Sequence, residues 1–205
     1  MVRKRIVAQT VVAIAASCLL GALNVSLAAD KTEEGFVSLF NGKNLDGWHL
    51  MSGAKFVVED GVLKHDVGLG WLCSDKEYSD FIVRLEFRFM KPKQDGGVFL
   101  RSGKEGKNWP DQKYEIQIEN TQRMAMIFGA AHDLKVALVK KTLKPDGQWN
   151  EYDIKIVGPR IEVRLNGELV TTSDSASTLK RGYLGFQAEN GVHEYRNIRI
   201  KDLSK

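Results

Sequence analysis

The amino-acid sequence predicts an all-β protein, a two-sheet antiparallel β-sandwich of jelly-roll type. From residue 36 onward, short segments of alternating apolar and polar residues are separated by turn residues, with no long amphipathic helix pattern between them. Many short antiparallel strands in one chain bury their apolar faces best as two packed sheets. The chain of 205 residues, 43% apolar and 27% charged, has the composition of a folded globular protein and not of a disordered one.

The clearest strand is the segment 81–89, FIVRLEFRF, in which apolar and charged residues alternate without a break. This period of two places the aromatic and aliphatic side chains on one face of a strand, whereas a helix would scatter them around its axis. Similar runs predict further strands at 97–102, 113–119, 124–129, 151–157, 160–165, 182–188 and 192–200.

Glycine-containing turns separate these runs, at 60–61, 95–97, 145–147, 158–159 and 166–167. Asn166-Gly167 fits a two-residue type I′ turn and predicts a hairpin over 161–170. Tyr195 and Ile198 are both of core type but three residues apart, which predicts a β-bulge in the last strand. A short helix or a loop is expected only at about 171–181. Without repeats or linkers, one domain is expected.

The N-terminus has the pattern of a signal peptide over residues 1–28. Arg3, Lys4 and Arg5 precede an apolar run from Ile6 to Leu23, and cleavage after Ala28 would leave a single domain at 29–205. A membrane anchor is disfavoured because polar residues interrupt the run and no basic cluster follows it. A lipoprotein at Cys18 is a minor alternative. We therefore expect export to the periplasm or the medium, with no membrane span after cleavage.

Charge and cysteine content exclude several classes of function. The formal net charge of +4 falls to about +1 without the three basic residues of the signal, so no basic stripe for nucleic acid is expected. Two cysteines in the whole chain exclude a disulfide scaffold and a cysteine-built zinc site. Cys73 lies in an apolar segment and is expected to be a small buried residue, with a reactive thiol as the alternative.

Polar side chains gather on the non-core faces of three predicted strands. Glu115, Gln117 and Glu119 share one face of 113–119, while Gln187 and Glu189 share that of 182–189. Arg101 has the same parity in 97–102. If these strands lie in one sheet, the arginine, the carboxylates and the amides converge on one surface. An ordinary solvated sheet face is the alternative.

The run Glu-Ile-Gln-Ile-Glu also suggests a glycosidase pair. Glu115 and Glu119 have Cα atoms roughly 13 Å apart along a strand, and leaning side chains could approach the separation of about 5–10 Å that glycosidases use. The run is similar to the Glu-x-Asp-x-Glu strand of the laminarinase-type β-glucanases, except that Gln117 replaces the central aspartate. A laminarinase-like β-glucanase therefore stays a second alternative.

A resemblance to the 3-keto-disaccharide hydrolase family, formerly a domain of unknown function, covers nearly the whole mature chain. Its motifs occur here in order as FNGKNLDGW (40–48), GVFLR (97–101), YEIQI (114–118), QWN (148–150), NG (166–167), GYLGFQ (182–187) and YRNI (195–198). The segments 95–97 and 188–191 depart from the family pattern. The resemblance implies a concanavalin-like jelly roll.

The resemblance also implies a substrate oxidised at C3 of the sugar ring, such as a 3-keto-glycoside. The ketone acidifies the C2 proton, so that a base can remove it and the group at C1 can leave. On that template Glu115 is the candidate base, Arg101 the candidate for stabilising the enolate, and Gln117 and Gln187 the residues that hold sugar hydroxyls. A non-catalytic carbohydrate-binding module of the same fold is the leading alternative.

Further candidates lie in loops and at strand ends. His132 is a candidate acid, base or metal ligand, and Trp109 could stack on a sugar ring. Glu119 and Glu189 are candidate substrate-binding residues. The sequence requires no cofactor, although Glu115, Glu119 and His132 could assemble a divalent metal site. It leaves the oligomeric state open.

Overall fold

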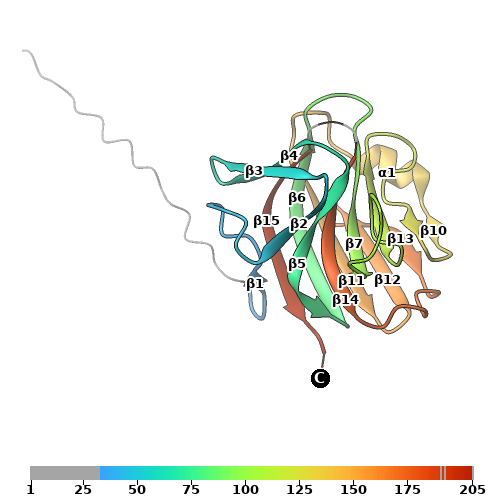
Figure 1. Ribbon diagram of the computed structural model, residues 1–205. Coiled ribbons are helices and arrows are strands. Elements are labelled where there is room, and N and C mark those ends of the chain that lie inside the picture. The colour runs from blue at the N-terminus through green and yellow to red at the C-terminus, as the bar shows by residue number, and fades with distance from the viewer. Residues whose placement is uncertain (1–32, 190, 192, 205) are drawn as a thin grey trace, which may run out of the picture. The chain divides into compact units, whose positions relative to one another are not determined.

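The computed structural model describes residues 33–189, 191 and 193–204, so the predicted signal peptide lies outside the described residues. Over this range two antiparallel sheets, of nine and six strands, form the β-sandwich that the sequence predicts (Figure 1). Among the described residues, no helix has the length and apolar content to span a membrane.

The nine-stranded sheet places β6 (Phe81–Phe89) between β11 (Asn150–Val157) and β15 (His193–Asp202). Outward from β11 lie β12 (Arg160–Leu165), β13 (Glu168–Ser173) and β10 (Asp133–Leu134). On the other side of β15 lie β4 (Val62–Val67) and β3 (Lys55–Glu59), while β1 (Val37–Ser38) also pairs with β15. The six-stranded sheet has the order β2 (Trp48–Ser52), β5 (Gly70–Tyr78), β14 (Gly182–Ala188), β7 (Asp95–Ser102), β8 (Tyr114–Glu119) and β9 (Ile127–Phe128).

The core forms between the two sheets because the alternation in each strand points one apolar row inward. In β6 every second residue is buried and the residues between are half-buried, as the sequence predicts. Strand β8 differs, since all six of its residues are buried. Its core-facing residues Ile116 and Ile118 are fully enclosed, and so is the opposite, polar face. Other parts of the protein therefore cover the polar face of β8.

Two local features that the sequence predicts are confirmed, a hairpin at 161–170 and a β-bulge in the last strand. The strands β12 and β13 form the hairpin around Asn166-Gly167, with a register shift after Val163. The register of β15 against β6 shifts between Arg196 and Arg199, where Asn197 has a φ of 51°. This bulge lets both Tyr195 and Ile198 enter the core despite their spacing.

Three local expectations are wrong. The helix α1 (Val136–Thr142) lies where none was expected, whereas the loop that the sequence allowed within 171–181 is present after β13. Helix α1 has seven residues and buries only Val139, too little for an amphipathic pattern to show. The run 124–129 gives only the two-residue strand β9, because Ala125 has a φ of 65° and turns the chain. The expected turn at 95–97 is the start of β7.

Candidate functional site

The candidate site is the outer face of the six-stranded sheet around β7, β8 and β14. Six polar side chains of this face form what we call the carboxylate–amide face: Asp95, Glu115, Gln117, Glu119, Gln187 and Glu189. Register brings them together, since Gln117 pairs with Gly97 and Glu119 with Asp95 across β7 and β8. On the other side of β7, Gly185 of β14 pairs with Phe99. This face is buried at β8, so the alternative of an ordinary solvated face does not hold there.

Glu115 lies at the centre of this face, beside the bare backbone of Gly97. A Cβ atom on Gly97 would come within 2.8 Å of Glu115 Oε1 and 3.2 Å of Gln187 Oε1, so both side chains lean over the glycine. Only 6% of Glu115 is exposed. Burial, together with the nearby charges of Asp95 and Glu189, raises the pKa of Glu115 to about 7, against the opposing charges of Lys113 and Arg123. A carboxyl group with this pKa is suited to proton transfer near neutral pH.

The two amides of the face are each held by a carboxylate. Gln117 Nε2 donates to Asp95 Oδ1 at 2.6 Å and to Glu119 Oε2 at 3.1 Å. Gln187 Nε2 donates to Glu189 Oε2 at 2.9 Å. The strand itself is anchored from the other sheet, since the Tyr152 hydroxyl donates to the Gln117 carbonyl oxygen at 2.8 Å. These contacts join Gln117 to Asp95 and Glu119, and Gln187 to Glu189, while the position of Gln187 Oε1 over Gly97 brings β14 to the same face.

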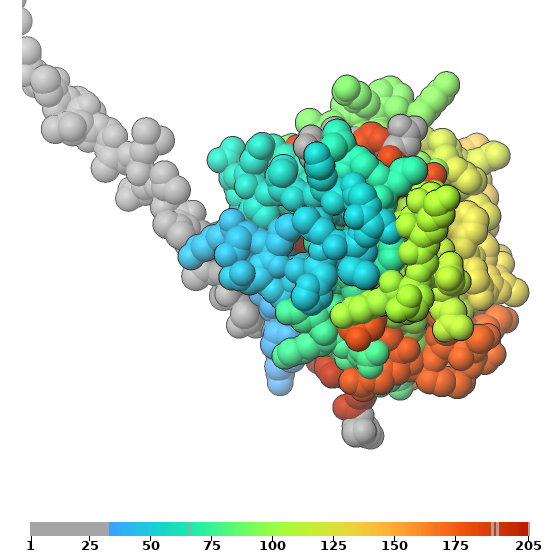
Figure 2. Space-filling view, in the orientation of Figure 1, coloured from blue at the N-terminus to red at the C-terminus, as the bar shows by residue number. Residues whose placement is uncertain are grey.

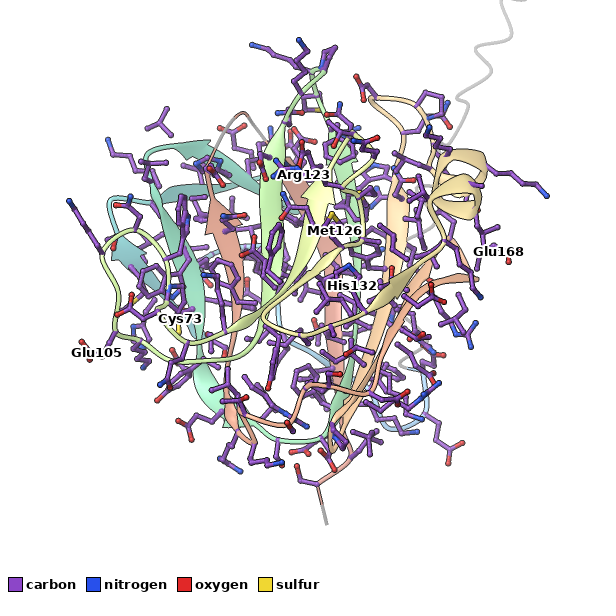
Figure 3. The ribbon with its side chains drawn as sticks, turned by 90° about the vertical axis from the view of Figure 1, so that its right-hand side faces the viewer. Cys73, Glu105, Arg123, Met126, His132 and Glu168 are labelled. Atoms are coloured by element: carbon purple, nitrogen blue, oxygen red, sulfur yellow. The ribbon has the colours of Figure 1, made fainter. Side chains whose placement is uncertain are left out.

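Arg123 supplies the cation of this face, and sequence reasoning missed it. It lies in the turn that follows β8, and Figure 3 shows it above Met126 and His132. Its Nη2 contacts Asp95 Oδ2 at 3.0 Å and Glu119 Oε2 at 2.6 Å. Burial and the nearby charge of Glu119 together raise the pKa of Asp95, against the effect of Arg123. The one available signal was the spacing of four residues between Glu119 and Arg123 in a turn.

The expectation for Arg101 is wrong. Arg101 has a φ of 48°, and the register of β14 against β7 shifts next to it, so its side chain leaves the face that parity assigns to it. Its guanidinium is 1% exposed and donates to the backbone carbonyls of Ser79, Gly158 and Leu179 and to Asp80 Oδ1. These bonds occupy four of its five N–H groups. Arg101 therefore holds the fold and does not face a ligand beside Glu115.

His132 is also placed away from the expected cluster. It lies where the chain passes from β9 to β10, at the edge of the other sheet, and its Nδ1 is bonded to the carbonyl oxygen of Ala130 at 3.1 Å. Figure 3 shows Arg123 and His132 at different heights along the strands. Within the described ranges, no group of three or more His, Cys, Asp or Glu side chains is placed to hold a metal ion. The expected set of Glu115, Glu119 and His132 is thus not assembled.

Trp109 covers an apolar patch next to the carboxylate–amide face. The loop 103–113 carries it over Trp71, Cys73 and Phe99, all of which are buried. The Ser52 hydroxyl fixes this loop by donating to the Lys107 carbonyl oxygen at 2.5 Å. Figure 2 shows the loop, in yellow-green, as a ridge on the surface beside the cyan segment. Burial raises the pKa of the Cys73 thiol, which confirms the expected buried residue.

The jelly-roll fold and the family match that follows place the chain among glycosyl-hydrolase-like, carbohydrate-active domains. The chain belongs to the 3-keto-alpha-glucoside-1,2-lyase-like domain family, whose profile matches residues 35–201. This confirms the family resemblance that the sequence motifs indicated.

Other known proteins are similar to this chain in part of their sequence, and solved structures are similar to it in fold. A levanase from Bacillus sp. (strain L7) is 26% identical over 187 residues, which are 86% of this chain but 20% of the levanase. The chain thus spans about one fifth of that relative. A proposed glycosyl hydrolase of Parabacteroides distasonis ATCC 8503 has a TM-score of 0.73 at 20% identity, over 83% of this chain and 95% of that one. The carbohydrate binding module CBM66 from Bacillus subtilis has a TM-score of 0.56 at 15% identity, over 75% and 94%.

Proposed function

We propose that the protein is an exported enzyme that cleaves 3-keto-glycosides, including 3-keto-disaccharides, at the glycosidic bond. The observation that carries the proposal is Glu115, a nearly buried carboxyl group whose pKa lies at about 7, between two amides that can hold sugar hydroxyls. Membership of the 3-keto-alpha-glucoside-1,2-lyase-like family supports the choice of substrate. Glu189 and Arg123 are only partly buried, so a ligand can reach the face from their side.

The reaction starts with removal of the C2 proton. The C3 ketone makes this proton acidic, and the carboxylate of Glu115 takes it while the electron pair of the C–H bond forms an enolate with C3 and its oxygen. When the ketone reforms, that pair becomes a C1–C2 double bond and the C1–O bond breaks, so the aglycone leaves as an alkoxide and takes up a proton. Addition of water across the resulting enone gives net hydrolysis, and release of the enone gives a lyase.

We assign to Lys113 the role that the sequence suggested for Arg101, which is to stabilise the enolate oxygen. Its Nζ lies 4.0 Å from Glu115 Oε2 and donates to the Pro110 carbonyl oxygen at 3.1 Å, so the ammonium group is held next to the base. A fixed cation beside developing negative charge lowers the barrier more than a mobile one, because it needs no reorganisation during the reaction.

A second candidate function is a non-catalytic carbohydrate-binding module. It is favoured by the match to only one fifth of a levanase and by the likeness to CBM66. A binding module would need the amides and the aromatic residue Trp109 to contact a sugar. It would not need a buried carboxyl group such as Glu115, whose nearest cation, Lys113, is 4.0 Å away. A laminarinase-like β-glucanase is less well supported, because Arg123 and Gln117 already engage the Glu119 oxygen that would act with Glu115.

A single assay separates these functions. The protein is incubated with a 3-keto-disaccharide, its unoxidised parent and levan, and released sugar is measured. The proposed enzyme releases sugar from the oxidised substrate alone, and Glu115→Gln abolishes the release while Glu168→Gln, on the other sheet, leaves it unchanged. Binding of levan or of the unoxidised parent without any release, unaffected by Glu115→Gln, would instead establish the binding module.

A further inference from the structure

Two buried amide oxygens of the carboxylate–amide face have no hydrogen-bond partner among the described residues. They are Oε1 of Gln117 and Oε1 of Gln187, on residues that are 3% and 4% exposed. An unsatisfied buried acceptor destabilises a protein by about 1–3 kcal/mol, so such atoms in folded proteins usually meet water or a ligand. These oxygens therefore mark places where a ligand is expected to donate hydrogen bonds.

Asp95 and Glu189 fix the orientation of the Gln117 and Gln187 amide groups, and so determine which amide atom faces a ligand. An ionised carboxylate can only accept hydrogen bonds, so the amide groups must turn their nitrogen atoms toward Asp95 and Glu189. The carbonyl oxygens then point the other way. Without these carboxylates each amide could rotate and present its NH₂ group instead. Asp95 and Glu189 thus decide whether this face donates or accepts.

A third acceptor borders the same space. Glu115 Oε1 and Gln187 Oε1 approach one point above Gly97, and Gln117 lies directly opposite Gly97 on β8. Acceptor oxygens from two strands therefore gather over the one residue of this row that has no side chain. Hydroxyl groups that donate into this space complement it, whereas ether, ester or carboxylate oxygens would place acceptor against acceptor.

The charges around this space are mostly negative. Four carboxyl groups, those of Asp95, Glu115, Glu119 and Glu189, belong to the face, against the cations Arg123 and Lys113. Arg123 is engaged by Asp95 and Glu119, and Lys113 lies beside Glu115. An anionic ligand would meet like charges in a poorly solvated place, where repulsion is stronger than in water.

We propose that Asp95 and Glu189 are positioning residues that hold the two amides of this face as hydrogen-bond acceptors, so that it selects uncharged sugars with free hydroxyl groups and rejects sugars that carry carboxylate, sulfate or phosphate groups. The proposal rests on the proposed function for the identity of the 3-keto ring and concerns the selection of the ligand, not its cleavage.

The test compares two ligands that differ in one group. Binding of methyl 3-keto-glucoside and of the corresponding 3-keto-glucuronide, in which a carboxylate replaces the CH₂OH group, is measured by calorimetry on Glu115→Gln, which prevents turnover. The neutral glycoside is expected to bind at least about tenfold more tightly. Equal or tighter binding of the glucuronide, or binding of neither ligand, would overturn the proposal.

The positioning role is tested by Glu189→Gln in the same background. The new amide can offer either its oxygen or its NH₂ group, so Gln187 is free to rotate, and the ratio of the two affinities is expected to fall at least about threefold. Glu168→Gln removes the same charge from the other sheet and is expected to leave the ratio unchanged. An unchanged ratio in Glu189→Gln would show that Glu189 has no such role.

The outcome of the binding comparison does not depend on whether the protein cleaves the substrate. If the wild-type protein releases no sugar but Glu115→Gln still prefers the neutral ligand, the proposed enzymatic function fails and the selection stands. If sugar is released but the glucuronide binds equally well, the selection fails and the enzyme stands.

Discussion

Glu115 and Gln187 lean over the backbone of Gly97 from opposite neighbouring strands, so that their Oε1 atoms lie 2.8 Å and 3.2 Å from the position of a Gly97 Cβ atom. The glycine is what allows this approach, because any side chain would occupy the space between them. A carboxyl group held against a second acceptor and away from water favours its protonated form. The packing at Gly97 therefore bears on both the proposed binding of a sugar and the proposed proton transfer.

The rate of cleavage should depend on pH through Glu115. As a base, Glu115 must be ionised, and with a pKa of about 7 the value of kcat/KM should fall about tenfold per pH unit below neutrality. Glu189→Gln removes a charge that raises this pKa, so the midpoint should move to lower pH. Lys113→Gln removes an opposing charge and should move it to higher pH. A rate that rises toward acid would contradict the role of Glu115 as the base.

The stability of the protein should also depend on pH through Glu115, but it should fall with rising pH where the cleavage rate increases. Its pKa is raised from 4.5 to about 7 by folding, so the folded state holds a proton that the unfolded state has lost. The stability that this gives is complete below pH 4.5 and is lost as the pH rises through 7, to a total of about 3 kcal/mol. Glu115→Gln should therefore stabilise the protein at pH 8 but not at pH 4, as measured by urea unfolding. An equal effect at both pH values would contradict this account.

Replacement of Arg101 should affect folding before catalysis. Arg101→Ala removes the guanidinium donor of three backbone carbonyls and leaves Asp80 with only the Gly158 N–H, and it should lower the free energy of unfolding by about 3–5 kcal/mol. Arg101→Lys should recover less than half, because one ammonium group cannot reach all four acceptors. The exposed Arg160 is the control, and Arg160→Ala should leave the urea midpoint unchanged. Loss of activity in an Arg101 variant of unchanged stability would restore a catalytic role.

Removal of Trp109 should expose the thiol of Cys73. In a Cys18→Ser background, Trp109→Ala is expected to raise the rate of reaction with a thiol reagent at least about tenfold, because the indole covers the patch around Cys73. Trp149 is the matched control, since it packs between Arg88 and Arg196 on the other sheet. Trp149→Ala should leave the thiol rate unchanged. A thiol that stays unreactive in Trp109→Ala would show that other residues cover it.

Strand periodicity predicted most of the fold and five of the six residues of the carboxylate–amide face, all but Asp95. A period of two fixes the face of each side chain in a regular strand, which is why Glu115, Gln117 and Gln187 were found from the sequence alone. The prediction for Arg101 failed because Arg101 has a positive φ and lies next to a register shift, which together reverse the alternation of faces that the prediction assumed. Arg123 was missed because it acts from a turn, where side-chain direction depends on local backbone angles that periodicity does not encode.

The mode of attachment of Arg101 also has a consequence for engineering. Three of its four acceptors are main-chain carbonyls, at Ser79, Gly158 and Leu179, and a carbonyl oxygen is the same whatever side chain its residue carries. Position 79 can thus be varied, as in a library of loop variants, provided that the arginine remains, whereas Leu179 also packs against the hydrophobic core and must stay apolar. This end of the sandwich offers a scaffold for grafting new recognition loops.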